Sequence, residues 1–155
     1  MTKVSLILMV LLSSVPARAQ WEWGHPVPQG NDLWNVDFAP SSSAGWAVGA
    51  AGIILRSSNG GASWTVQESG REDILRGVHA ATSNTAWAAG DNGVVLRTTN
   101  AGYTWGQQYS GTTAGINTVF AIDANVAVFV GDAGMLRTTT NGGVTWVARS
   151  TGTAS

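Results

Sequence analysis

The chain has 155 residues, no cysteine and a formal net charge of −1, and 44% of its residues are hydrophobic. This composition is typical of one globular unit and excludes a disordered or collagen-like chain. Only 11% of the residues are charged and Lys and Arg form no cluster, so we expect no binding of nucleic acid.

The first 19 residues have the pattern of a secretory signal peptide. Lys3 supplies the positive start, residues 4–12 form an apolar run, and Ala-Arg-Ala at 17–19 fits a small-residue cleavage site. We expect cleavage before Gln20 and export to the periplasm or the extracellular space. The apolar run is short for a bilayer span, so an uncleaved membrane anchor is the weaker alternative, and no stable membrane insertion of the mature chain is expected.

A repeat of 41 residues covers the remaining domain, residues 20–155. The intervals 64 − 23, 105 − 64 and 146 − 105 all equal 41 and join four tryptophans, Trp23, Trp64, Trp105 and Trp146. Glycines and asparagines keep the same interval, among them Gly49, Gly90 and Gly131, and Asn59, Asn100 and Asn141. The repeats are about 24–64, 65–105 and 106–146, followed by a partial strand in 147–155.

Each repeat contains four short apolar runs separated by turn residues. In the first repeat we expect strands at 33–38, 45–48 and 53–56, and a fourth that starts near Ser63 and Trp64. The unbroken triplet Ile53-Ile54-Leu55 fits a strand covered on both faces. A helical solenoid is not expected, because no stretch of a dozen residues combines a helical apolar pattern with freedom from Gly.

Four strands in about 40–45 residues are the pattern of a β-propeller blade. The predicted fold class is therefore all-β, with three four-stranded propeller blades and one extra strand at Trp21–Trp23. Three blades do not close a ring, since propellers usually have four to eight. Either a longer gene supplies further blades, or identical chains complete a ring as a homo-oligomer, two copies giving six blades.

A turn motif recurs at residues 57–64, 98–105 and 139–146, with the order hydroxyl, any, Asn, any, Gly, any, hydroxyl, Trp. An Asn side-chain oxygen can accept backbone N–H groups just ahead of it, Gly can adopt positive φ, and Trp can cover the turn. These features serve local hydrogen bonding, so we interpret the motif as structural. Its residues are Asn59, Gly61, Trp64, Asn100, Gly102, Trp105, Asn141, Gly143 and Trp146.

This motif resembles the Asp-box, also called the bacterial neuraminidase repeat, with Asn where Asp is most frequent. A longer pattern includes Leu33-Trp34-Asn35-Val36, Gly45–Gly49 and Gly52–Arg56 ahead of the box. It is similar to the photosystem II stability/assembly factor family of propellers over residues 21 to about 152. The resemblance implies a non-enzymatic scaffold for an unknown protein partner, and a role in photosynthesis does not follow from it.

The same resemblance implies an arginine patch that contacts the partner, and Arg56 and Arg97 are the matching positions. Arg137 stands one residue early in its repeat, and a one-residue shift in a strand points a side chain to the other face. Guanidinium groups bind carboxylates through two parallel hydrogen bonds. The alternative for these arginines is an ion pair with a nearby carboxylate such as Asp91 or Asp132.

Two other function classes are weaker hypotheses. A sialidase-like fragment would need an activated Tyr with acidic partners, and neither Tyr103 nor Tyr109 has an evident base. A glycan-binding module would need exposed aromatics, for which Trp21 and Trp34 are the candidates. Four acidic residues, Glu68, Glu72, Asp73 and Asp123, provide carboxylates without a spacing that selects a catalytic pair. We therefore expect no catalytic residue, no cofactor and, since His25 and His79 lack metal-ligand spacing, no metal ion.

Overall fold

The computed structural model describes residues 30–150 and residue 152 of the chain. The expected signal peptide at 1–19 and the expected extra strand at Trp21–Trp23 lie outside the described residues. His25 and Trp21 also lie outside them.

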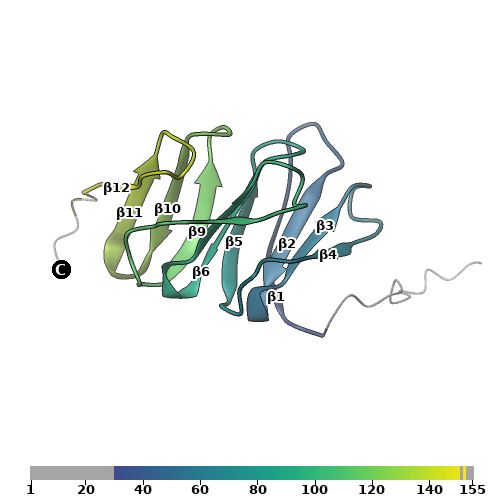
Figure 1. Cartoon of the computed structure of the whole chain (residues 1–155), viewed down its shortest axis with the longest axis horizontal. Helices are drawn as coiled ribbons and strands as arrows, with labels where there is room; N and C mark the ends of the chain where they lie inside the picture. The colour runs from purple at the N-terminus through teal and green to yellow at the C-terminus, as the bar shows by residue number, and fades with distance from the viewer. Residues whose placement is uncertain (1–29, 151, 153–155) are drawn as a thin grey trace, which may run out of the picture.

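Three antiparallel four-stranded sheets make up the described part of the chain, and we call them blades 1, 2 and 3 (Figure 1). Blade 1 contains β1 (Leu33–Phe38), β2 (Gly45–Gly49), β3 (Ile54–Ser57) and β4 (Thr65–Gln67). Blade 2 contains β5 (Leu75–Ala80), β6 (Ala86–Gly90), β7 (Val95–Thr98) and β8 (Gly106–Gln108). Blade 3 contains β9 (Ile116–Ala121), β10 (Ala127–Gly131), β11 (Met135–Thr139) and β12 (Val147–Ala148).

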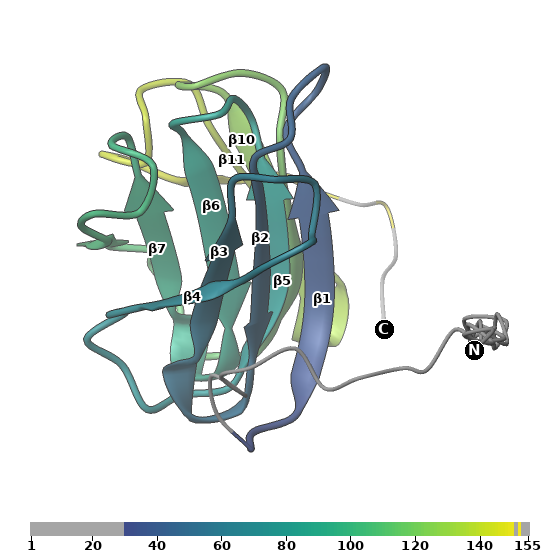
Figure 2. The ribbon, with the colours of Figure 1, turned by 90° about the vertical axis from the view of Figure 1, so that its right-hand side faces the viewer.

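The strands follow one another in sequence order across each sheet. The first strands, β1, β5 and β9, contact one another from blade to blade, and the short fourth strands form the opposite edges of the sheets. Figure 2 shows the sheets stacked one behind another, with β1 at one side of blade 1. This stacking of like sheets is the arrangement of propeller blades, and the predicted all-β fold class is confirmed. Strand β12 completes blade 3, which accounts for the partial strand predicted after Trp146.

A tight 3-10 turn joins the second and third strands of each blade: Ala50–Gly52, Asp91–Gly93 and Asp132–Gly134. The last residue of the first turn, Gly52, has φ 67°, and an added Cβ there would collide with the carbonyl oxygen of Arg71. The turn thus packs directly beneath the loop that leads into blade 2. Only glycine combines this conformation with this close approach.

Two apolar cores hold the blades together, and each lies between neighbouring sheets. The first junction, between blades 1 and 2, buries Trp46, Val48 and Ile54 against a surface that includes Leu75, Val78, Ala88 and Leu96. The second junction, between blades 2 and 3, buries Trp87, Ala89 and Val95 against Ile116, Val119, Phe129 and Trp146. Both faces of blade 2 are therefore covered, as its apolar triplet Val94-Val95-Leu96 predicts.

Candidate functional site: blade junctions and the inter-blade loop

Each Asp-box forms a turn that is closed by its own side chains. In the first box, Asn59 Oδ1 accepts the backbone N–H of Ser63 at 2.9 Å, and Asn59 Nδ2 donates to Ser63 Oγ at 2.8 Å. Ser57 Oγ accepts the backbone N–H of Gly61 at 2.9 Å. The same bonds join Asn100 to Thr104 and Asn141 to Thr145. The asparagine amides are used within the turns, which leaves them little capacity for a ligand.

The box tryptophans of blades 2 and 3 lie in the blade junctions, whereas that of blade 1 does not. Trp105 packs against the first core, and Trp146 lies in the second, where its ring is 5.7 Å from that of Trp87. Trp64 occupies the same position in blade 1 but lies on the outer face of that blade. The rings of Trp105 and Trp146 thus serve packing between blades, whereas Trp64 packs on its own blade and has no second described blade against it.

The arginines that the resemblance singles out do not lie together. Arg56 pairs with Trp46 across β3 and β2, and Arg97 pairs with Trp87 across β7 and β6, so each points into its own junction. Arg137 pairs with Phe129 of β10. The equivalent pair in blade 2 is Leu96 and Ala88, not Arg97 and Trp87. Arg137 therefore projects from the opposite face of its strand, as the one-residue shift in the third repeat predicts.

Arg97 is a structural link across the second junction. Its Nη1 donates to the carbonyl oxygen of Gly142 at 3.2 Å and its Nη2 to that of Ala124 at 2.7 Å. The guanidinium carbon lies 5.0 Å from the centroid of Trp87, a cation–π distance. Burial lowers the pKa of Arg97, yet an arginine stays charged at neutral pH. Two of its N–H groups are thus bonded inside the fold, while its Nε is buried without a partner among the described residues.

Arg56 has a different environment in the first junction. It lies 5.6 Å from the Trp46 centroid and lines a cleft of about 330 Å³ with Gln67, Glu68 and the exposed Tyr103. Within the described residues its guanidinium makes no hydrogen bond, and its Nε is buried without a partner. Nor does it pair with Asp91, which binds Arg76 instead. Arg56 is the better placed of the two matching arginines to bind an external carboxylate.

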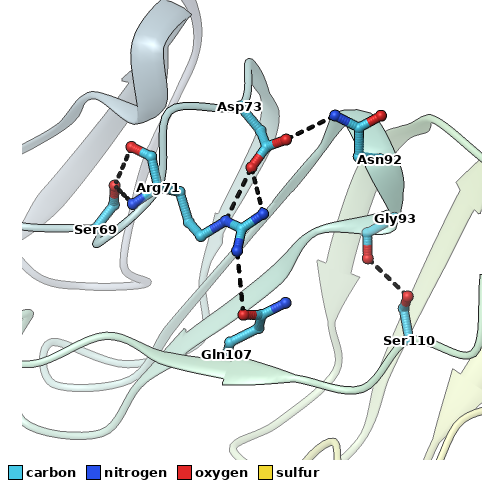
Figure 3. A network of polar contacts seen from close by, with 7 residues as sticks. All are labelled: Ser69, Arg71, Asp73, Asn92, Gly93, Gln107 and Ser110. Carbon is cyan, nitrogen blue, oxygen red and sulfur yellow. Dashed lines mark hydrogen bonds and ion pairs between the residues drawn. The ribbon is translucent and has the colours of Figure 1, made fainter. Parts of the chain in front are cut away.

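The loop between blades 1 and 2 carries a polar network (Figure 3). Arg71 donates to Asp73 Oδ2 from Nε at 2.9 Å and from Nη2 at 2.6 Å. Asn92 Nδ2 donates to the other carboxylate oxygen at 2.7 Å, and Arg71 Nη1 reaches Gln107 Oε1 at 3.4 Å. These contacts tie the loop to two elements of blade 2.

An open cleft of about 640 Å³ beside this network contains Glu72, Asp73 and Asp91. The hydrogen bond from Asn92, supported by Arg71, lowers the pKa of Asp73. Asp91 is paired with Arg76, whose pKa it raises. A carboxylate-pair hydrolase needs one carboxyl group that is protonated and therefore has a raised pKa. The pKa of Asp73 is shifted in the opposite direction, so the network favours a structural role.

The remaining sequence candidates do not gather into a reactive site. Tyr103 and Tyr109 are 88% and 86% exposed. His79 Nε2 lies 3.9 Å from Asp37 Oδ2, and burial lowers the pKa of His79 despite the opposing effect of Asp37. Backbone N–H groups of two following residues lower the pKa of Asp123. In the part of the chain that the structure describes, no three His, Cys, Asp or Glu residues group as metal ligands would.

Gln67 links blade 1 to blade 2, and the sequence analysis did not single it out. Its Oε1 accepts Nε1–H groups from both Trp46 and Trp105 at 3.1 Å, and its Nε2 donates to the carbonyl oxygen of Ala101 at 2.9 Å. Gln108 follows it at the repeat interval of 41 residues. That spacing was a visible signal for a shared position, but the pattern did not show that Gln67 crosses to the next blade.

No helix among the described residues is both long enough and apolar enough to cross a bilayer.

The comparisons with known proteins agree with this architecture. YCF48 from Cyanidioschyzon merolae is 28% identical with a TM-score of 0.70, over 79% of this chain and 41% of that one. A structure of YCF48 bound to a D1 peptide is 21% identical with a TM-score of 0.68, over 78% and 40%. An ancestral GH74 enzyme is 19% identical with a TM-score of 0.59, over 75% and 18%.

The last two likenesses, with their low identities, show the fold alone. No curated protein sequence matches the chain significantly, and the chain spans about two fifths of the length of the two YCF48 structures. The sequence model of one family, described as photosynthesis system II assembly factor YCF48, matches residues 14–155. Because this match covers nearly the whole chain, the chain belongs to that assembly-factor family.

Proposed function

We propose that this chain is an exported, non-enzymatic propeller scaffold that binds a carboxylate-bearing segment of a protein partner in the Arg56 cleft. The proposal is supported by membership of an assembly-factor family and by the existence of a family structure named as bound to a D1 peptide. A peptide-like ligand is therefore the class of partner to test first.

The observation that carries the proposal is the difference between two arginines at one register position. Arg97 donates to two main-chain carbonyls, whereas the Arg56 guanidinium has no hydrogen-bond acceptor among the described residues and lines an open cleft. Charge-assisted hydrogen bonds from a guanidinium to a carboxylate are among the stronger polar contacts. The adjacent Tyr103 ring is exposed and offers an apolar face to the same ligand.

Binding of a labelled D1 peptide, followed by fluorescence anisotropy, tests this site. Arg56→Gln should weaken binding about tenfold or more, because it removes a charge-assisted contact of about 1.5–3 kcal/mol. A peptide whose carboxylates are replaced by amides should lose affinity for the unchanged protein to a similar extent. Arg97→Gln is the matched control, since it alters the same residue type at the equivalent position and should leave affinity within about twofold.

Equal loss of affinity in both arginine variants, or no binding by the unchanged protein, would count against the Arg56 site. Hydrolysis of a glycoside panel by the purified chain would contradict the scaffold function, and selective binding on a glycan array would favour a lectin. Export is tested separately by N-terminal sequencing of the protein recovered outside the cytoplasm. We expect the mature chain to start at Gln20, and an intact Met1 in that fraction would argue against signal cleavage.

A further inference from the structure

The outer face of blade 1 exposes residues that are core residues in the other two blades. Leu33, Val36 and Phe38 of β1 are 50%, 55% and 37% exposed. At the matching register positions, the exposed fractions are 0%, 4% and 0% for Leu75, Val78 and Ala80, and 0%, 2% and 3% for Ile116, Val119 and Ala121. The blade 1 face therefore has the composition of a blade-docking surface.

A cleft of about 570 Å³ lies on this face. Its walls include Leu33, Val36, Leu55 and the box residue Trp64, and no charged side chain lines it. The corresponding tryptophans of blades 2 and 3 lie in the junctions. An apolar sheet face fits this surface better than a charged segment does.

The outer face of blade 3 presents the opposite half of a junction. Val128 pairs with Phe120 of β9. In the other blades the residues at this register position are Trp46, which pairs with Asp37, and Trp87, which pairs with His79. Val128 therefore occupies the position of the junction tryptophan. Phe120 and Val130 are 54% and 36% exposed. The outer faces of blades 1 and 3 are thus the two complementary halves of a blade junction within the described residues.

The side-chain sizes at the two ends are complementary in an unusual way. At the first junction a large residue, Trp46, shares the core with the small residues Ala80 and Ala86. At the second, Trp87 shares it with Ala121 and Ala127. The end faces reverse these sizes.

At the ends, the blade 3 face carries the smaller Val128 and the blade 1 face carries Phe38 in place of alanine. Gly45 makes room for this ring, because an added Cβ there would lie 2.5 Å from Phe38. Phe38 also packs edge-on against Trp64 with the ring centroids 5.8 Å apart. A large residue on one end thus matches a small residue on the other, which preserves the packing volume of a junction.

We infer that the end face of blade 1 binds the end face of blade 3 of a second copy of this chain. Two copies joined head to tail at both ends form a closed ring of six blades, within the range of about four to eight that propellers use. Closure covers both apolar end faces, whereas a head-to-tail contact that failed to close would propagate into open polymers. This interface does not depend on which ligand enters the Arg56 cleft.

The test begins with the molar mass of the purified mature protein, measured by size exclusion with light scattering over a wide concentration range. The expected species has the mass of two chains. Val36→Glu on blade 1 and Val130→Glu on blade 3 should each abolish the dimer, because each places a charge in the apolar interface. Val144→Glu is the control: Val144 is 74% exposed within a box turn, and the dimer should persist. Circular dichroism verifies that each variant is folded.

Mixing the two monomeric variants distinguishes head-to-tail from face-to-face pairing. An equal mixture of Val36→Glu and Val130→Glu retains one unaltered pair of faces and should form a mixed dimer. A face-to-face dimer of blade 1 would instead survive Val130→Glu alone. That result would overturn the inference, as would a monomer at all concentrations, which would leave the face to another protein or to residues 1–29.

The size relation provides an independent test. Val128→Trp should abolish the dimer, because the indole would meet Phe38, and the additional substitution Phe38→Ala should restore it by recreating the pairing of the internal junctions. A folded double variant that stays monomeric would contradict the proposed contact between these positions. Masses that rise without limit with concentration would contradict closure by two copies.

Discussion

The two blade junctions use the same residue types at the same repeat positions but link the blades differently. In the first junction Gln67 accepts the indole N–H of Trp46 in its own blade and crosses to blade 2, where it binds the indole N–H of Trp105 and the carbonyl oxygen of Ala101. In the second, Gln108 donates to Gly106 of its own blade. There Arg97 donates to the carbonyl oxygen of Gly142 instead, the repeat equivalent of Ala101.

One box carbonyl thus receives a side-chain donor in each junction, but the donor is an amide in one and a guanidinium in the other. A clear difference in packing accompanies this exchange. Phe129 stands at the register position of Ala88 and lies 4.6 Å from Trp146, centroid to centroid. In the second junction the Nε1 atoms of Trp87 and Trp146 are buried without a partner among the described residues. The comparison shows that aromatic contacts can take the place of hydrogen bonds at equivalent positions of the 41-residue repeat.

The largest expected difference in stability between variants of the two junctions comes from replacing the two glutamines, Gln67 and Gln108. Gln67→Ala leaves two indole N–H groups and one carbonyl without their partner and should lower the free energy of unfolding by about 3 kcal/mol. Gln108→Ala removes only a local bond and should change it by about 0.5 kcal/mol or less. Urea unfolding at constant protein concentration measures both. Equal losses would show that the two junctions are equivalent in solution.

The arginines should show the reverse order. Arg97→Gln removes two charge-assisted hydrogen bonds to carbonyls across the second junction, at an expected cost of about 2 kcal/mol. Arg56→Gln removes a cation–π contact without any hydrogen bond and should cost about 0.5 kcal/mol. The same unfolding experiment applies. A greater loss for Arg56 than for Arg97 would argue that Arg56 has a structural partner.

Replacement of each junction tryptophan by phenylalanine isolates the indole hydrogen bond. Trp46 and Trp87 are both fully buried, so the apolar loss should be similar in the two variants. Trp46→Phe additionally removes the donor to Gln67 and should be more destabilising by about 1 kcal/mol. If Trp87→Phe lowers the free energy of unfolding more than Trp46→Phe does, the second junction depends more on its indole than its hydrogen bonds indicate.

The smallest expected effect concerns His79 of blade 2, which contacts both neighbouring blades, through Asp37 of blade 1 and Phe120 of blade 3. Burial lowers the pKa of His79 in the folded state, so well above pH 6.5 the group is neutral in both states and contributes no pH dependence. Below that pH the unfolded chain takes up the proton first, and stability falls by at most about 1.4 kcal/mol per pH unit until the folded-state pKa is passed.

His79→Gln should flatten the dependence of stability on pH as the pH falls below about 6.5, measured by urea unfolding at a series of pH values. Asp73, whose pKa is also lowered, acts in a separate window, because stability from a lowered carboxyl pKa is lost only below about pH 4. An unchanged slope in the His79 variant would assign the pH dependence just below pH 6.5 to another group.

The repeat positions were more informative about the fold than about the candidate site. The interval between tryptophans and the turn glycines predicted the three blades and the order of their strands, because strand length and turn chemistry are local properties. The shift at Arg137 predicted the change of face for the same reason, since side chains alternate strictly along a strand. The roles of Arg56 and Arg97 could not be separated in this way, because their neighbours come from the following blade.

The sequence by itself determined the blade as a unit: four short strands, a tight turn at Gly52 and a box closed by Asn59, each formed by residues close in the chain. Only the tertiary structure decided which side chain links one blade to the next, why Gln67 bridges and Gln108 does not, and that Leu33, Val36 and Phe38 remain uncovered within the described residues. These features depend on contacts between residues about 40 positions apart, and the space beside a side chain is fixed only when the neighbouring sheet is in place.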